Sequence, residues 1–540
     1  MKKFLAIALA SAMVLSLAAC GGAATTTTNA ETQAAAATVA PTTQVTNEVV
    51  TKEAATAAEG ETLTYKKRIT IAHHQANVSR GPQDNYSGMQ KIIEFMTFNQ
   101  LTAFNPDTKK MEGELAESWT TEEGGKVWTF KLKKGVKFQN GEELKADDVV
   151  YTMERAKELG KCTGAMTGAI EKVEAVDDYT VKFTLTGPNM DYDFTLTNAY
   201  ASILNRKACE EDPEIGYGIG TGGWKIKEFA ANDYTLWERF DDSFVWWDTG
   251  VSPTEEIKVV YMADQNARML GVQAGDLDIG CIANNTEYDN YKADPSLNPV
   301  ICASYSNDYV GMNALCEYFQ DENVRKAVAY ALNREEALEI VNNGFGIPLY
   351  NMWCIDTIGY KDNFDEKWEY NLEKAKEYLA KSKYPNGFSC RLTTISSYSL
   401  YAETVQAQLA AIGINCEVDL TDSPGMGEGG TNGTFEMYVW NTTQSPYGDN
   451  MRNLITTDGA ANYAHFSNAR IDELMDAGVA ETDEAKRAEI YGQVQDELHN
   501  DAYIVPLFYG YLSNLTRANV EGYIFSSQGY DFTYVKAVED

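Results

Sequence analysis

Positive charge is scarce in this chain. Its 540 residues include 45 lysines and arginines against 79 aspartates and glutamates, which gives a formal net charge of −34 at pH 7. Such a surface repels phosphate backbones and anionic lipid headgroups, so the composition disfavours nucleic acid and acidic membrane surfaces as partners. The acidity alone indicates a highly soluble protein and carries no further functional information.

Residues and motifs for metal binding and catalysis are also few. Of four histidines only His73 and His74 are adjacent, and neighbouring side chains point in different directions, so solvated or hydrogen-bonded histidines are favoured over a metal site. There is no HExxH and no GxSxG motif, and the acidic residues are too numerous to single out a catalytic pair. We therefore expect no metal, no other cofactor and no enzyme activity.

Cysteine pairing is left open by the sequence. The nine cysteines contain no CxxC pair and no metal-site spacing. Setting Cys20 aside, an exported protein can pair some of the remaining eight, but their spacing does not say which. Cys390 and Cys416 lie on the apolar faces of predicted strands, where we expect small buried side chains.

Long apolar runs are absent except at the N-terminus. Lys2 and Lys3 precede an apolar run from Phe4 to Leu17, and Leu-Ala-Ala leads into Cys20. This length is typical of a signal peptide rather than a membrane span, and the cysteine matches the bacterial lipobox. We expect a signal peptide over 1–19 and a diacylglycerol anchor on Cys20. A secretory signal with a chance cysteine is the alternative.

The following stretch, 20–62, is rich in Ala and Thr and almost free of large apolar residues. It cannot bury enough surface to offset the entropy lost on ordering. We therefore expect a disordered tether that holds the folded part away from the membrane.

The most informative stretch that is present runs from Glu114 to Ala156. Apolar and polar residues alternate from Trp128 to Leu132, which predicts a half-buried strand that resumes at Val136 and Phe138 after Gly135. Asn140-Gly141 predicts a tight turn. Asp147 and Asp148 favour a helix N-terminus. The residues expected on the buried face of this helix are Val149, Val150, Met153 and Ala156.

Strands and helices alternate in two later parts of the chain. The sequence predicts a strand, a helix and a strand at 257–262, 264–274 and 277–279, and again at 388–392, 405–412 and 414–420. Short connections of this kind indicate parallel pairing in an α/β sheet. The Gly-rich segment from Gly216 is followed by a strand, so it is not a phosphate-binding loop. A second Gly-rich segment, Pro424 to Gly433, predicts a flexible loop.

These motifs resemble, in order, those of one protein family. LAESW, WTFKLKKGVKF, NG, ADDVVYTMERA and the later GTGGWKIKEF…ER…WW are similar to the extracytoplasmic solute-binding proteins of the oligopeptide/dipeptide/nickel class, the substrate receptors of ABC importers. Lys145 departs from the Thr or Ser with which the family usually caps the helix. The resemblance extends from about Leu63 to Val535.

The resemblance implies an α/β, two-lobed periplasmic-binding-protein-like fold of type II with an extra subdomain in the first lobe. It places the start of lobe I at 63–85, the extra subdomain at 86–215 and the rest of lobe I at 216–308. Lobe II is expected at 309–510, and the chain returns to lobe I at 511–540.

The family also implies where ligand contacts lie. Its peptide binders carry a W-x-x-D motif whose aspartate pairs with the peptide ammonium group. Here the motif begins at Trp440, and its last position is Thr443. Asp449 supplies the charge if the loop after Pro446 folds back. The predicted ligand-binding residues are Trp440, Thr443, Asp449, Tyr86, Tyr309 and Phe508.

The resemblance thus implies a monomeric lipoprotein on the extracytoplasmic face of the bacterial cell membrane. It would capture oligopeptides or dipeptides in a cleft between its lobes and deliver them to the transmembrane subunits of an ABC permease. Because Thr443 replaces an acid, an oligosaccharide, nickel chelate or opine cargo is the alternative.

Overall fold

We analysed a computed structural model of the chain. It describes β1 (Val49–Val50) and residues 63–84, 88–105, 108, 110–160, 164–283, 285–355, 357–364, 366–444, 447–526 and 529–539. The predicted signal peptide, the lipidation site at Cys20, most of the predicted tether and Tyr86 lie outside the described residues. The chain divides into two units, 1–44 and 45–540, and the description below concerns the second.

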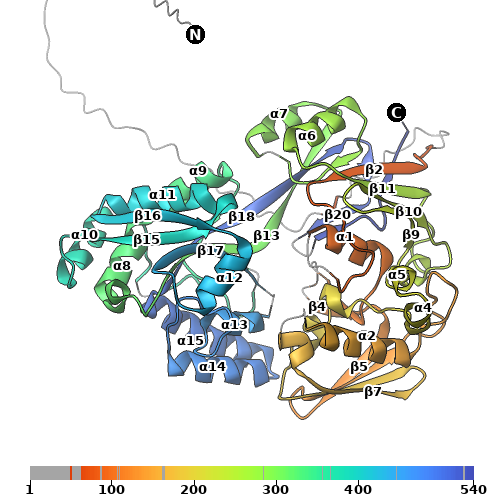
Figure 1. The fold of residues 1–540 in the computed structure, drawn as a ribbon, viewed down its shortest axis with the longest axis horizontal. Coiled ribbons are helices and arrows are strands. Elements are labelled where there is room, and N and C mark those ends of the chain that lie inside the picture. The colour runs from red at the N-terminus through yellow and green to blue at the C-terminus, as the bar shows by residue number, and fades with distance from the viewer. Residues whose placement is uncertain are drawn as a thin grey trace, which may run out of the picture. The chain divides into compact units, whose positions relative to one another are not determined.

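An eleven-stranded sheet connects two lobes (Figure 1). Ten strands follow in spatial order, and β14 (Gly346–Pro348) pairs with β18 beside them. The order is β16 (Ile414–Thr421), β15 (Phe388–Ile395), β17 (Met437–Thr443), β13 (Leu297–Met312), β18 (Ile504–Arg517), β12 (Ile279–Gly280), β2 (Arg68–His73), β11 (Glu256–Tyr261), β10 (Tyr234–Arg239) and β9 (Trp224–Ala230).

In the first lobe, β2 pairs in parallel with both β11 and β12, which confirms the predicted α/β pairing. Helix α6 (Gln265–Ala274) connects β11 to β12; the Asp264 side chain caps its N-terminus and Gly275, at φ +85°, ends it. Helices α1 (Gly88–Thr97) and α7 (Tyr288–Ala293) belong to the same lobe.

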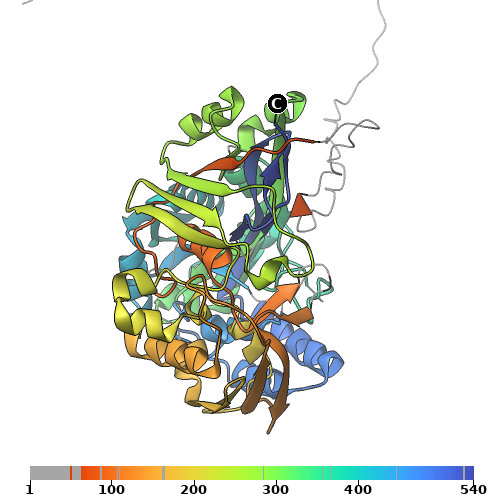
Figure 2. The same ribbon diagram turned by 90° about the vertical axis from the view of Figure 1, so that its right-hand side faces the viewer.

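The C-terminal segment packs into the core of this first lobe (Figure 2). Tyr523, Phe525, Tyr530 and Phe532 lie in the core that contains Ile69 and Ile71 of β2. The strands of this segment are β19 (Val520–Glu521), β20 (Tyr523–Ser526), β21 (Gly529–Asp531) and β22 (Lys536–Ala537).

The second lobe has helices on both faces of its strands. Strands β15 and β16 pair in parallel, and β15 also pairs in parallel with β17. Each face has its own apolar core. One face is covered by α8 (Glu322–Ala331), α9 (Arg334–Asn342), α10 (Leu372–Lys381) and α11 (Ser399–Ala410). The other is covered by α12 (Ser423–Thr431), α13 (Arg452–Ile455), α14 (Ala469–Ala480) and α15 (Glu484–Asp501).

A separate four-stranded sheet forms a subdomain of the first lobe. The predicted strand at Trp128 is β6, and the predicted helix at Asp147 is α2 (Ala146–Leu159). The backbone N–H of Lys145 donates to the Asp148 carboxylate at 2.9 Å, so Asp148 stabilises a helix start that has no Ser or Thr cap. The strand order is β5 (Ala116–Glu122), β6 (Val127–Leu132), β8 (Thr180–Leu185) and β7 (Ile170–Asp177).

The remaining elements of this subdomain are short. They are β3 (Thr102–Asn105), β4 (Lys110–Gly113), α3 (Tyr192–Thr195), α4 (Arg206–Glu211) and α5 (Pro213–Gly216).

Two local predictions were wrong. Val136 and Phe138 do not resume a strand: both are buried, but the segment forms only a single bridge between Lys137 and Glu143 around the Asn140-Gly141 turn. The Gly-rich stretch 424–433 is mostly helix α12 rather than a flexible loop. The Asp422 side chain caps this helix and Met426 is buried beneath it, so tertiary packing overrides the low helix propensity of glycine.

Within the described ranges, no helix combines the length and the apolar character needed to cross a membrane.

Candidate functional site

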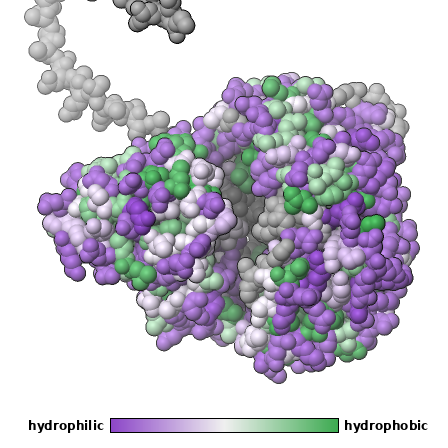
Figure 3. Space-filling view, viewed as in Figure 1, coloured by the Kyte–Doolittle hydropathy of each residue, from purple (hydrophilic) through white to green (hydrophobic). Residues whose placement is uncertain are grey.

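Strands β13 and β18 form the connection between the lobes. They pair antiparallel from Leu297 opposite Arg517 to Gly311 opposite Ile504. Val300 of β13 lies in the core of the first lobe, whereas Val310 of the same strand lies in that of the second. Figure 3 shows a hollow between the two lobes. The face of the molecule seen in this view is mostly hydrophilic. Ligands of α/β proteins bind in such inter-lobe crevices.

A group of residues at the edge of the second lobe surrounds one carboxylate. We call it the Asp308 cluster: Asp308, Tyr398, Tyr401, Trp440, Asn441 and Phe508. Asp308 on β13 lies opposite Asn441 of β17 and Phe508 of β18. Tyr398 and Tyr401 follow the carboxyl end of β15. This is the edge at which ligands meet parallel strands.

The Asp308 carboxylate is buried, with 5% of the residue exposed, and it accepts hydrogen bonds from the hydroxyls of Tyr398 and Tyr401. Burial raises its pKa to about 7, because desolvation penalises the charged form more than the two hydrogen bonds favour it. The Asn441 side-chain amide donates in turn to the Tyr398 hydroxyl. The cluster therefore holds a carboxyl group that changes its charge near neutral pH.

Aromatic rings line the cluster from its half-exposed rim to its buried base. The ring centroid of Tyr398 lies 5.9 Å from that of Trp440 and 4.7 Å from that of Tyr401, and Tyr401 stacks on Phe508 at 5.5 Å. Tyr398, Tyr401, Trp440 and Asn441 are half-buried, while Phe508 has no exposed surface. Two predicted ligand residues, Trp440 and Phe508, thus lie in one connected aromatic group.

The other predicted residues lie elsewhere. Thr443 is exposed at the end of β17, and its carbonyl accepts from the Asn450 side chain at 2.8 Å. Tyr309 points to the opposite face of the sheet, where it is 1% exposed and its ring lies 6.0 Å from that of Tyr438. A ligand in the inter-lobe hollow therefore has no direct access to the Tyr309 ring in this conformation.

Asp449 lies where the second lobe touches the subdomain of the first. We call this place the Arg487 contact: Asp191, Asp193, Tyr447, Asp449 and Arg487. Arg487 of α15 forms a buried ion pair with Asp191, which precedes α3. Nearby, the backbone N–H of Met190 donates to the Val479 carbonyl at 3.3 Å. The Tyr447 ring meets the edges of Phe104 and Phe194, at centroid distances of 6.5 and 5.6 Å.

Negative charge exceeds positive charge at the Arg487 contact. Burial, with the nearby charge of Asp449, raises the pKa of Asp191 to about 8 although Arg487 pairs with it. Burial likewise raises the pKa of Asp193 to about 6. Asp191 and Asp193 both interact with the Arg487 guanidinium group, and Asp191 is held close to its protonated state at neutral pH.

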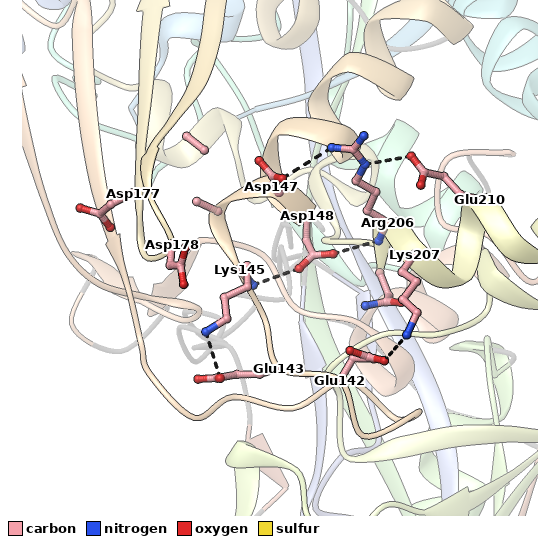
Figure 4. A pocket seen from close by; sticks show the side chains of 13 residues that line it. Glu142, Glu143, Lys145, Asp147, Asp148, Asp177, Asp178, Arg206, Lys207 and Glu210 are labelled. Atoms are coloured by element: carbon pink, nitrogen blue, oxygen red, sulfur yellow. Dashed lines mark hydrogen bonds and ion pairs between the residues drawn. The ribbon is translucent and has the colours of Figure 1, made fainter.

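A third polar site lies on the subdomain, around the N-terminus of α2 (Figure 4). It is an open pocket of about 700 Å³. Its basic groups are already paired: Lys145 with Glu143 at 2.9 Å, Lys207 with Glu142 at 2.6 Å and Arg206 with Glu210 at 2.8 Å. These exposed pairs satisfy the three basic groups of the pocket, and the rest of its charged lining is acidic.

The adjacent histidines do not form a metal site with other side chains. His73 is fully buried and its ring contacts those of His74 and Tyr530 at 4.5 and 5.3 Å. Burial lowers the pKa of His73 to about 3, so it is neutral. In the part of the chain that the structure describes, no three His, Cys, Asp or Glu side chains are grouped to hold a metal ion.

Sequence reasoning missed Asp308, Tyr398, Tyr401, Asn441 and Arg487. No strand was predicted around Asp308, and no pattern in the sequence singles it out. The two tyrosines follow a predicted strand of the α/β sheet, which marks a ligand edge. Arg487 lies within a long polar helix and has no comparable signal.

Comparison with protein-family models gives one match. The model described as bacterial extracellular solute-binding proteins, family 5 Middle, matches residues 110–465. The matched range includes α2, all of β17, and β13, which is one of the two strands that connect the lobes. It therefore covers most of the described site, including the Asp308 cluster apart from Phe508.

Curated relatives extend the likeness over most of the chain. The glutathione-binding protein of Escherichia coli strain K12 is 24% identical over 485 residues, which cover 86% of this chain and 94% of the relative. The dipeptide-binding protein of the same strain is 25% identical over 475 residues, covering 80% of this chain and 87% of the relative.

A solved structure gives the corresponding fold. The oligopeptide-binding protein AppA from Bacillus subtilis, in complex with a nonapeptide, has a TM-score of 0.72 and 25% identity, and covers 89% of this chain and 100% of AppA. The predicted α/β, two-lobed periplasmic-binding-protein-like fold is confirmed. These similar proteins are substrate-binding proteins of transport systems, not enzymes.

Proposed function

Because the chain belongs to the bacterial extracellular solute-binding proteins of family 5, we propose that it is the substrate-binding lipoprotein of an ABC importer. In this role it captures oligopeptides or dipeptides between its two lobes and delivers them to the membrane permease. The dipeptide-binding and glutathione-binding relatives, together with AppA and its nonapeptide, support a peptide cargo.

The observation that carries this proposal is the aromatic and polar edge of the second lobe. Trp440 and Thr443 lie at the carboxyl end of β17, and Asp449 follows in the same loop region. We propose that these three side chains contact the ligand, with Trp440 as a wall. Tyr309 and Phe508 support the site from within the core, since both are buried. Exposed main-chain and hydroxyl groups then satisfy the ligand backbone and leave its side chains hydrated.

We further propose that Cys20 carries the lipid anchor and that the protein acts as a monomer on the extracytoplasmic face of the membrane. The lipobox-like sequence before Cys20 and the Ala- and Thr-rich stretch after it support this placement. Closure of the lobes around the ligand would create the surface that the permease recognises.

The threonine at position 443 supports a second class of cargo as the alternative. An acid at this position would pair with a peptide ammonium group, and threonine cannot do so. An oligosaccharide, nickel chelate or opine would not require that acid. The receptor class is the same for either cargo.

Thermal unfolding of the purified protein tests the cargo. We would compare di- to pentapeptides, oligosaccharides and nickel chelates, and we expect peptides to raise the melting temperature. A ligand at about a hundred times its Kd adds roughly 2.7 kcal/mol to the free energy of unfolding. A shift with sugars or chelates and none with peptides would overturn the peptide cargo and leave the receptor class intact.

A further inference from the structure

Asp308 is a buried carboxylate without a cationic partner. Among the residues that the structure describes, no lysine, arginine or histidine forms an ion pair with it. Its polar neighbours are the hydroxyls of Tyr398 and Tyr401. Burying a carboxylate without a counter-charge is costly, so such a group is either protonated or completed by a cation from outside.

The position of Asp308 gives an incoming cation a route. In the regular pairing of β13 with β17, Asp308 lies opposite Asn441, and Ser306 lies opposite Thr443. Directly opposed residues point to the same face of a sheet, and so do residues two apart on one strand. Asp308 therefore lies on the same face as Thr443, beside the position at which the family motif would carry its acid.

The backbone at Asp308 is irregular. The pairing of β13 with β18 shifts register between Asp308 and Tyr309, and again between Ala303 and Asn307. Such bulges re-aim a side chain and occur next to binding sites. Asp308 and Tyr309 point to opposite faces as successive strand residues do, so Asp308 faces the tyrosines while Tyr309 enters the opposite core.

The groups around Asp308 suit an organic cation. The half-buried ring of Tyr398 lies at the rim, and a protonated amine is attracted both to an aromatic face and to a carboxylate. Trp440 opposes Tyr309 on the other face of the sheet, and its ring contacts that of Tyr398. The net charge of −34 favours the approach of a cation to the protein. A bare metal ion would need further ligands, because in the described chain Asp308 belongs to no group of three His, Cys, Asp or Glu side chains that could hold one.

We propose that the Asp308 cluster is the subsite for a protonated amine of the ligand, with Asp308 as its counter-ion and the ring of Tyr398 as its wall. This inference rests on the proposed function and deepens it, because it defines the cargo as a solute with a free ammonium group. The acid missing at Thr443 is then supplied from the neighbouring strand.

The Arg487 contact is less suited to this role. Asp449 lies close enough to Asp191 for their charges to interact. An ammonium group entering there would meet the guanidinium of Arg487, which is 8% exposed and already paired with Asp191. Like charges at that distance repel, whereas nothing cationic faces Asp308 in the described residues.

The test compares oligo-alanines of two to five residues with their N-acetylated forms by calorimetric titration of the full-length protein. We expect the wild type to bind the free amines and to lose this binding on acetylation. Asp308→Asn keeps the shape of the side chain and removes its charge. It should weaken binding of the free amine about thirtyfold or more, since removing one partner of a buried charge pair has effects of that order.

Two further variants make the result specific. Glu114→Gln is the matched control, since Glu114 also has a pKa raised to about 7 by burial but lies in the first lobe, where Asn99 and Gln100 donate to it. It should retain the preference for free amines. Asp449→Asn should retain that preference as well, even if its affinity falls.

The outcomes separate the two proposals. Loss of the amine preference in Asp308→Asn alone supports the subsite. Retention of that preference in Asp308→Asn, or its loss in Asp449→Asn alone, overturns the subsite and leaves peptide binding in place. If the wild type binds only neutral sugars or chelates, both the amine subsite and the peptide cargo fail, and the receptor class stands. A melting curve of each variant shows whether it is folded.

Discussion

At the scale of single residues, the chemistry is set by carboxyl groups that burial keeps close to neutrality. Asp308 and Asp191 have pKa values raised to about 7 and about 8, in both cases chiefly by desolvation. Each is therefore sensitive to a nearby positive charge, which favours the ionised form. Arg487 supplies this charge to Asp191, and we propose that the ligand supplies it to Asp308.

Amine binding should depend on pH in a defined way. Asp308 must be ionised to hold an ammonium group, so affinity should rise with pH up to about 7 and fall again above about 8, where a peptide amine loses its proton. Burial keeps the pKa of Tyr398 and Tyr401 above their usual range, and Asn441 and Phe508 do not titrate. Titrations at half-unit pH steps would check this. A rise of the same size in Asp308→Asn would contradict the assignment.

Without ligand, the ionisation of Asp308 should lower the stability of the protein as pH rises. The folded-state pKa of Asp308 lies above its ordinary value of 3.8, so the folded state binds the proton more tightly than the unfolded state. Its effect on stability is therefore absent in acid and becomes unfavourable as pH rises from about 4 to about 7, by at most about 1.4 kcal/mol per pH unit. At pH 8, ligand-free Asp308→Asn should melt at a higher temperature than the wild type, and at pH 4 the two should coincide. Differential scanning calorimetry measures both.

The residues that sequence reasoning missed share a physical cause. Asp308 is adjacent in sequence to Tyr309, which was predicted, but its burial depends on pairing with β17 and β18, more than a hundred residues away. No local pattern contains that information. Trp440 was identified through a motif, but its contact with Tyr398 was not predicted, because Tyr398 lies in a turn after β15 and Trp440 lies on β17.

At the scale of elements, apolar periodicity predicted the strand-helix-strand units at 257–279 and 388–420, while the glycine-rich segment at 424–433 was predicted wrongly. Helix α9 begins after Asn333, whose side chain accepts from the backbone N–H of Glu336 at 3.2 Å. Helix α12 was missed because its glycines lower helix propensity, whereas in the folded protein they allow close packing. A Cβ atom on Gly430 would lie 2.4 Å from the Tyr463 ring.

Helix α12 offers a matched pair of substitutions. Gly430→Ala should destabilise the protein by about 1–3 kcal/mol, because the new methyl group has to displace the half-buried Tyr463 ring. Gly427→Ala lies on the same helix with its nearest outside atom at 3.9 Å. It should be neutral or stabilising by up to about 1 kcal/mol through helix propensity. Urea unfolding would measure both, and equal effects would contradict this account of α12.

At the scale of the whole molecule, the family motifs predicted the two-lobed fold, while the contact between the lobes could be described only from the structure. Arg487 and Asp191 are separated by almost three hundred residues, and neither belongs to a recognised motif. The interface combines their ion pair with a backbone hydrogen bond and the Tyr447 ring. It is therefore a polar contact that can open and close rather than a permanent apolar one.

Removing the guanidinium group should loosen the lobes. Arg487→Gln leaves Asp191 buried beside Asp193 and Asp449 without a counter-charge, so we expect a larger radius of gyration by small-angle X-ray scattering. Lys486→Gln is the matched control, since it removes the same charge from an exposed neighbour on α15. Adding Asp191→Asn to Arg487→Gln should restore much of the compact form. An unchanged radius in Arg487→Gln would show that the ion pair does not hold the lobes together.

The paired strands β13 and β18 have one more consequence. A ribbon of two hydrogen-bonded strands resists stretching and sliding, since either motion breaks many main-chain bonds at once, but it yields readily to torsion. The register shifts at Asn307 and Asp308 lie in this ribbon and beside the proposed amine subsite. At Asn307 and Asp308, however, β13 also pairs with β17, so this end of the ribbon is anchored in the sheet of the second lobe. A ligand held at Asp308 would therefore contact the anchored end of the ribbon, and torsion would be taken up in the stretch between the lobes.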